Sequence, residues 1–172
     1  AAMRAQMDKM CYVAPCLQTD LRAQLSQALN AVVPMPEPCK VFLCNSGSEA
    51  VESAIKIAWA ITGRNKIYAS SHSYHGATIG ASAISGDPRR RFAEPGITGT
   101  RFFASPFSDA PAFAGLSPVD RTELALRLLQ DQLTRDGAST VAAIFIEPVI
   151  GSGGVYVWPE GFLQRVRVLC DT

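Results

Sequence analysis

The sequence lacks an excess of charge of either sign: 16 lysine and arginine residues stand against 15 aspartate and glutamate residues, a net charge of +1 at pH 7. A nucleic-acid partner is therefore not expected, because such proteins present a basic surface. No run approaches the ~20 apolar residues that span a bilayer, so no membrane partner is expected either. The densest basic cluster, Arg89-Arg90-Arg91, follows Gly86-Asp87-Pro88 and is interpreted as a solvated turn.

The sequence also lacks a methionine at position 1 and a signal-peptide pattern, which favours a chain that begins within a longer gene. It has few cysteines, at positions 11, 16, 39, 44 and 170. Their odd number indicates thiols in a reducing compartment, so a cytoplasmic protein is expected. The pairs 11/16 and 39/44 have spacings that a zinc site could use, but Cys44 lies in an apolar run and neither pair encloses a knuckle-type turn. No metal site is expected.

What the sequence does have is the composition of a globular protein, with 48% apolar and 18% charged residues over 172 positions. Apolar runs of strand length alternate with stretches of helical period. This predicts an α/β fold with three layers, αβα, around a mostly parallel sheet. We expect a helical lead-in over 1–40 and the sheet with its flanking helices over 41–172.

The expected elements follow from the same periodicity. Strands are predicted over 41–44, 66–70, 100–104 and 141–146, the last being apolar throughout, as in a strand buried on both faces. Helices are predicted over 19–32, 46–62, 76–85, 117–137 and 159–170, with a loop over 105–115 and a helix stop in the proline-rich run 34–38. In the second helix, the inward face should hold Val51, Ala54, Ile55, Ala58 and Ile61, and the outer side should hold Glu52 and Lys56.

Polar motifs directly follow three of these strands. Residues 45–49 follow the first, residues 71–76 follow the second, and Glu147-Pro148 follows the last. Ligands of open parallel sheets bind outside the carboxyl ends of the strands. Three segments that are distant in sequence are therefore predicted to converge on one site.

The first motif, Ser-Gly-Ser at 46–48, lies where a strand turns into a helix. The amides and dipole of a helix N-terminus suit a phosphate, Gly47 allows close approach, and Ser48 adds a hydroxyl donor. A plain capping box, in which Ser46 and Glu49 bond reciprocally, explains the same residues. The Gly-Lys-Ser/Thr ending of a P-loop is absent.

The other two motifs also allow two interpretations each. Tyr74 could stack on a flat heteroaromatic ligand or pack against the sheet edge, and His75 could be functional or a satisfied structural histidine. Glu147 follows an apolar strand directly, where a carboxylate is costly without a partner. It therefore either orients groups in a polar crevice or forms a salt bridge to a neighbouring loop.

Three segments together resemble class III aminotransferases. Residues 42–58 (FLCNSGSEAVESAIKIA) look like the phosphate-binding segment of that family, 73–78 (SYHGAT) like its ring-stacking motif, and 146–155 (IEPVIGSGGV) like its strand-end glutamate segment. Their order and spacing also match, and the resemblance covers essentially the whole chain. It implies part of the large domain of a fold-type-I enzyme dependent on pyridoxal 5'-phosphate, normally a homodimer with active sites at the subunit interface.

The resemblance also implies roles for five cofactor-binding residues: Gly47, Ser48, Tyr74, His75 and Glu147. Gly47 and Ser48 would hold the cofactor phosphate, Tyr74 would stack on the pyridine ring, His75 would line the pocket, and Glu147 would orient groups on the hydroxyl side of the ring. The implied reaction is transamination of an amine or ω-amino acid with a keto acid, in which the cofactor acts as electron sink.

Two departures from the family pattern qualify this. The family's aspartate partner of the pyridine nitrogen and its Schiff-base lysine are expected beyond Thr172, so no catalytic residue is assigned here and the chain alone is expected to be inactive. Some members carry a glutamate five residues after the strand-end glutamate; the residue here is Ser152. This favours an ω-amine donor and pyruvate over ornithine- or γ-aminobutyrate-type substrates. Two other hypotheses stay open: an aminomutase or racemase of the same family, and a truncated, non-catalytic product.

Overall fold

The computed structural model describes residues 1–35 and 38–172, and the chain divides into two compact units, 1–43 and 44–172. The first unit holds the helices α1 (Ala2–Lys9) and α2 (Asp20–Val32). Thr19 caps α2, as its hydroxyl accepts a hydrogen bond from the Arg22 amide at 3.2 Å. The helix ends at Val32; of the proline-rich run predicted to stop it, residues 36–37 lie outside the described residues.

The strand predicted over 41–44 is wrong. These residues are in no strand, and Phe42 and Leu43 are 71% and 42% exposed. An apolar run becomes a strand only where a neighbouring strand satisfies its backbone hydrogen bonds. None of the strands in the described part of the chain pairs with this run.

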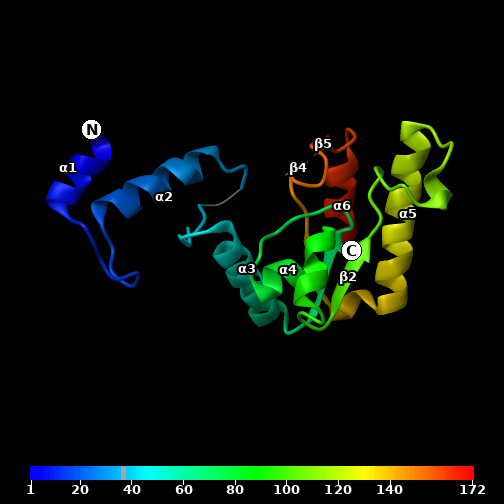
Figure 1. Ribbon diagram of the computed structural model, residues 1–172, viewed down its shortest axis with the longest axis horizontal. Coiled ribbons are helices and arrows are strands. Elements are labelled where there is room, and N and C mark those ends of the chain that lie inside the picture. The colour runs from blue at the N-terminus through cyan, green and yellow to red at the C-terminus, as the bar shows by residue number, and fades with distance from the viewer. Residues whose placement is uncertain (36–37) are drawn as a thin grey trace. The chain divides into compact units, whose positions relative to one another are not determined.

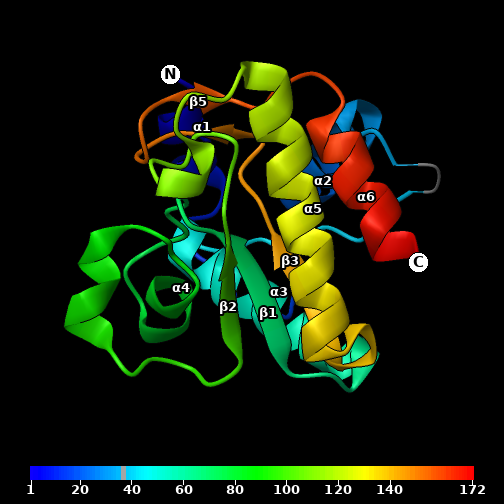
Figure 2. The ribbon, with the colours of Figure 1, turned by 90° about the vertical axis from the view of Figure 1, so that its right-hand side faces the viewer.

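The second unit is built on three parallel strands, β1 (Lys66–Ser70), β2 (Thr100–Phe103) and β3 (Val141–Phe145), in the order β2-β1-β3. Figure 2 shows them side by side, with α5 (Pro118–Asp136) running along the near face. Successive side chains of β1 face opposite sides: Ile67 and Ala69 join one core cluster, and Tyr68 joins the other.

Helices cover both faces of this sheet, as predicted. On one face lie α3 (Gly47–Thr62), which packs through Ile55, and α4 (Ile79–Ala83), followed by the buried Ile84. On the other face α5 and α6 (Phe162–Asp171) pack through Leu129 and Phe162. Figure 1 shows the two pairs of helices. The connections contain the short turns η1 (Pro88–Ala93), η2 (Pro111–Phe113) and η3 (Ala138–Thr140) and the hairpin of β4 (Val149–Ile150) and β5 (Tyr156–Val157). The unit is therefore a three-layer αβα structure.

Helix α3 confirms most of the predicted inward face. Ile55 is 1% exposed, and Val51, Ala54 and Ala58 are half-buried. Ile61 is 79% exposed, so its predicted inward position is wrong. Six residues at about 100° each rotate Ile61 by about 120° from Ile55, which removes it from the buried stripe.

Two further predictions need correction. All residues of β3 are half-exposed rather than buried on both faces, because among the described strands it pairs with β1 alone and its other edge is open. The helix predicted over 76–85 is confined to Ile79–Ala83, since Gly76 has φ 135° and Thr78 is extended with ψ 163°, and neither conformation is helical. By contrast α5 begins after the predicted cap Ser117 and ends before Gly137 at φ 78°.

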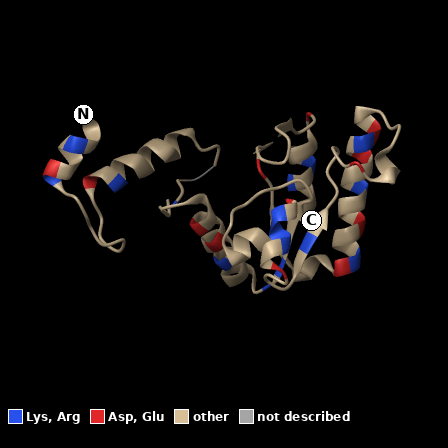
Figure 3. Cartoon of the chain, viewed as in Figure 1, with Lys and Arg blue, Asp and Glu red and all other residues tan. Residues whose placement is uncertain are grey.

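Basic and acidic residues are interspersed along the helices (Figure 3). None of the helices in the described ranges combines the length and the apolarity that crossing a bilayer requires.

Candidate functional site

The N-terminus of α3 keeps two amide donors unused. The Ser46 hydroxyl accepts a hydrogen bond from the Glu49 amide at 3.2 Å, while the Glu49 carboxylate reaches the Asn45 amide at 2.9 Å, one residue further back than a capping box requires. Within the described residues, no group accepts a hydrogen bond from the amides of Gly47 and Ser48. A Cβ on Gly47 would meet nothing within 4 Å, so an anion could approach this turn.

Ser48 connects this turn to the second motif. Its hydroxyl oxygen accepts a hydrogen bond from the Ala77 amide at 3.1 Å. A Cβ on Gly76 would lie 2.3 Å from that oxygen, and Gly76 has φ 135°, so both the close approach and the backbone conformation require glycine here. Because Ser48 acts as acceptor in this bond, its own proton stays available to a further acceptor.

Glu147 connects the second motif to the third. One carboxylate oxygen accepts a hydrogen bond from the Tyr74 amide at 2.8 Å, and the other accepts one from the Gly151 amide at 3.0 Å. The Trp158 indole donates to the Glu147 carbonyl at 2.8 Å. The salt-bridge interpretation of Glu147 is therefore wrong: its carboxylate oxygens accept from backbone amides of the loops after β1 and β4.

The Tyr74 ring has an unforeseen neighbour. The Arg89 guanidinium carbon lies 4.1 Å from the ring centroid, and Asp87 holds that guanidinium through two hydrogen bonds of 2.7 and 2.9 Å. The hydrogen bond from Arg89 keeps the pKa of the Asp87 carboxyl below its usual range. The basic run forms a turn, as predicted. The prediction of a solvated run did not include the contact between Arg89 and the Tyr74 ring. The only signal for it in the sequence is Asp87, two residues before Arg89.

His75 lies beside the same junction. Its amide donates to the Ser85 hydroxyl at 2.9 Å, and its ring meets the Phe145 ring edge-on, with centroids 6.1 Å apart. Burial lowers the pKa of this imidazole, and the negative charge of Glu147, which acts to raise it, offsets the effect only in part. Its Nε2 atom is buried and has no hydrogen-bond partner in the described chain, so His75 is not the fully satisfied structural histidine considered from the sequence.

Sequence reasoning missed Glu52. It was predicted to lie on the outer side of α3 with Lys56, but its carboxylate accepts hydrogen bonds from the Gly80 amide at 2.8 Å and the Ala81 amide at 3.2 Å. Burial alone would raise the pKa of this carboxyl, yet the hydrogen bonds from Thr78, Ala81 and Gly80 prevail and lower it. A helical wheel assigns Glu52 next to Lys56 but carries no information about the helix packed alongside.

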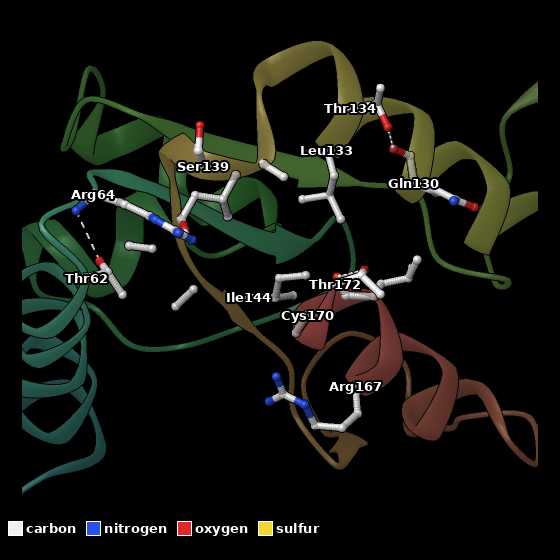
Figure 4. A pocket seen from close by; sticks show the side chains of 15 residues that line it. Thr62, Arg64, Gln130, Leu133, Thr134, Ser139, Ile144, Arg167, Cys170 and Thr172 are labelled. Carbon is white, nitrogen blue, oxygen red and sulfur yellow. Dashed lines mark hydrogen bonds between the residues drawn. The ribbon is translucent and has the colours of Figure 1, made fainter.

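Figure 4 shows a hollow that lies elsewhere. It has a volume of about 690 Å³ and follows the open edge of β3, between residues such as Arg64, Leu133, Ile144 and Arg167. None of the five predicted cofactor-binding residues lines it. The candidate site is instead the junction of the turn that begins α3 with the motifs after β1 and β3, which the bonds from Ala77 to Ser48 and from Tyr74 to Glu147 hold together.

A parallel sheet with helices on both faces defines an α/β protein, and in this class ligands bind outside the carboxyl ends of the strands, where the motifs after β1 and β3 meet here. A family model described as Aminotransferase class-III matches residues 1–172. The chain belongs to the class III aminotransferases, as its motifs suggested.

Known proteins of this family align over nearly all of the chain. It is 34% identical to an acetylornithine aminotransferase of Methanosarcina mazei and 35% identical to the 5-aminovalerate aminotransferase DavT of Pseudomonas aeruginosa, covering 99% of this chain in both cases. A taurine:2-oxoglutarate aminotransferase from Bifidobacterium kashiwanohense, solved in complex with PLP and glutamate, superimposes with a TM-score of 0.91 at 38% identity, over 99% of this chain and 39% of that one. The chain spans 37% and 39% of the length of the first two relatives.

Proposed function

We propose that the protein to which this chain belongs catalyses pyridoxal-phosphate-dependent transamination between an amine or ω-amino acid and a keto acid. The observation that carries the proposal is the hydrogen-bonded junction of Ser48 with Ala77 and of Glu147 with Tyr74. It supports a site in which the N-terminus of α3 would receive the phosphate, the Tyr74 ring would stack on the cofactor, and Glu147 would hold the Tyr74 backbone. Membership in the family, and the cofactor named for the taurine enzyme, support the same reaction.

The residues present fit this cofactor. The unused amides of Gly47 and Ser48, with the Ser48 proton, suit its phosphate, and Tyr74 offers a ring for its pyridine to stack on. Glu147 holds the Tyr74 backbone in place, and His75 presents an unpartnered ring nitrogen beside it. When bound, pyridoxal phosphate supplies an electron sink for the carbanion that transamination requires.

For the substrate, we propose an ω-amine donor and a monocarboxylic keto acid such as pyruvate. Ser152, in the exposed loop after β4, supports this choice, because a serine there brings no charge to read a second substrate carboxylate. The taurine relative's name includes 2-oxoglutarate, which makes that keto acid the competing acceptor to test.

We also propose that residues 1–172 alone carry out no transamination. Of the lysines in the unit 44–172, Lys66 begins β1 at the end of the strand away from Tyr74, and its amine donates to the Asp136 carbonyl at 2.5 Å. Lys56 is exposed on α3, two turns beyond Ser48. For the whole protein we propose a cytoplasmic homodimer, supported by cysteines without disulfides at 11, 16, 44 and 170 and by the exposed apolar residues of α2.

The test uses the full-length protein and the variant Tyr74→Ala, with Tyr12→Ala as control because Tyr12 is 81% exposed. Loss of ring stacking should weaken pyridoxal phosphate binding roughly three- to tenfold in Tyr74→Ala. Amine donors are assayed with pyruvate and with 2-oxoglutarate, and a reaction that consumes no keto acid would favour an aminomutase or racemase. Full-length protein that binds no pyridoxal phosphate would refute the proposal.

A further inference from the structure

Side chains, rather than a neighbouring strand, hold the backbone of residues 74–81. The amides of this segment donate to the acceptors Glu147, Ser85, Ser48 and Glu52. Since α4 begins only at Ile79 and its N-cap Thr78 is extended, the backbone before it is not helical, and these side chains determine where the segment lies. Two of these acceptors, Glu147 and Ser48, belong to the candidate site, and Ser85 lies just after α4. Glu52 lies about one helical turn along α3 from the unused amides.

From one face of α3, Ser48 and Glu52 both accept hydrogen bonds from the backbone of this segment. They are four residues apart, so their side chains point the same way. Ser48 accepts the Ala77 amide at 3.1 Å and Glu52 accepts the Gly80 amide at 2.8 Å. A Cβ on Gly80 would lie 2.3 Å from a Glu52 carboxylate oxygen, so a side chain at this position would force the carboxylate to move away from the Gly80 amide.

The geometry points to Glu52 as a positioning residue of the cofactor site. Its carboxylate fixes the separation between the turn at Gly47 and Ser48 and the segment that carries Tyr74. This inference rests on the proposed function. A rigid ligand with a phosphate at one end and a ring at the other gains affinity when both of its subsites are held at the correct separation in advance. Glu52 provides that preorganisation without touching the ligand.

The experiment compares two probes on full-length apoprotein: pyridoxal phosphate, which needs both subsites, and inorganic phosphate, which needs only the turn. In Glu52→Ala we expect pyridoxal phosphate to bind about tenfold more weakly, or worse, because two amide hydrogen bonds to a carboxylate are lost. The affinity for inorganic phosphate should stay within about twofold of wild type. Glu52→Gln keeps one acceptor oxygen and should lie in between, and the exposed Glu160→Gln serves as control.

Gly80→Ala gives a second, independent variant. Its Cβ would displace the Glu52 carboxylate, so it should weaken pyridoxal phosphate binding as Glu52→Ala does. In a protein that already carries Glu52→Ala the methyl group has room, and the added substitution should have little further effect. Such non-additivity is the signature of residues that act through one contact.

Three outcomes decide the matter. Pyridoxal phosphate binding in Glu52→Ala equal to that in Glu160→Gln would overturn the inference. Equal weakening of pyridoxal phosphate and inorganic phosphate would also overturn it, since that result indicates general damage to α3. A wild-type protein that binds no pyridoxal phosphate would instead refute the proposed function, so the two failures are distinguishable.

Discussion

Glu147→Ala is the substitution whose cost the structure defines best. It removes the acceptor of the Tyr74 amide, at 2.8 Å and partly buried, and of the Gly151 amide, at 3.0 Å and exposed. The exposed amide can turn to water, so most of the loss comes from Tyr74. A hydrogen bond to a charged group contributes about 1.5–3 kcal/mol, and we expect the free energy of unfolding to fall by about 2 kcal/mol.

The assay is native-state hydrogen exchange and urea unfolding of the full-length apoprotein. A loss of about 2 kcal/mol corresponds to exchange of the Tyr74 amide that is about 30-fold faster. Glu160→Ala, at an exposed position after β5, serves as control. If Glu147→Ala and Glu160→Ala showed the same exchange rate at Tyr74 and the same urea midpoint, the structural role assigned to Glu147 would be wrong.

Two further predictions concern stability, also of the full-length apoprotein. Ile55→Ala should lower the free energy of unfolding by about 2–5 kcal/mol, because Ile55 is buried. Ile61→Ala, at a site 79% exposed, should change it by no more than about 0.5 kcal/mol. Equal losses for the two variants in urea titrations would contradict the assigned faces of α3. The pKa of Asp136 is lowered by the hydrogen bond from Tyr68 and by the charges of Lys66 and Arg101. The stability that the ionised Asp136 contributes is therefore present above its unfolded pKa of about 3.9 and is lost as the pH falls through its lower folded pKa. In Asp136→Asn, the free energy of unfolding should fall less steeply with decreasing pH over that acidic range. An unchanged acid limb would count against this.

The local signals in the sequence were sufficient for most elements and for the family. Periodicity and turn chemistry located α3, β1 and α5, because Ser46 and Ser117 cap helices by bonds to amides only three residues on. The rule that parallel strands present their carboxyl ends at the same side of a sheet explains why the motifs after β1 and β3 meet, whereas the motif at 45–49 joins them from the start of α3 with no strand before it. The motifs themselves identified the class III aminotransferases.

The tertiary structure determined strand pairing and contacts between helices, which local sequence patterns cannot encode. Residues 41–44 carry a strand's composition, but an apolar run becomes a strand only when another strand pairs with it. The half-exposed β3 depends in the same way on its neighbours. The helical period placed Glu52 on an outer face, and only the packing of α4 against α3 turned it into an acceptor for Gly80. Residue types and spacing therefore determined which elements and motifs exist, whereas contacts between elements distant in sequence determined which side chains hold the site together.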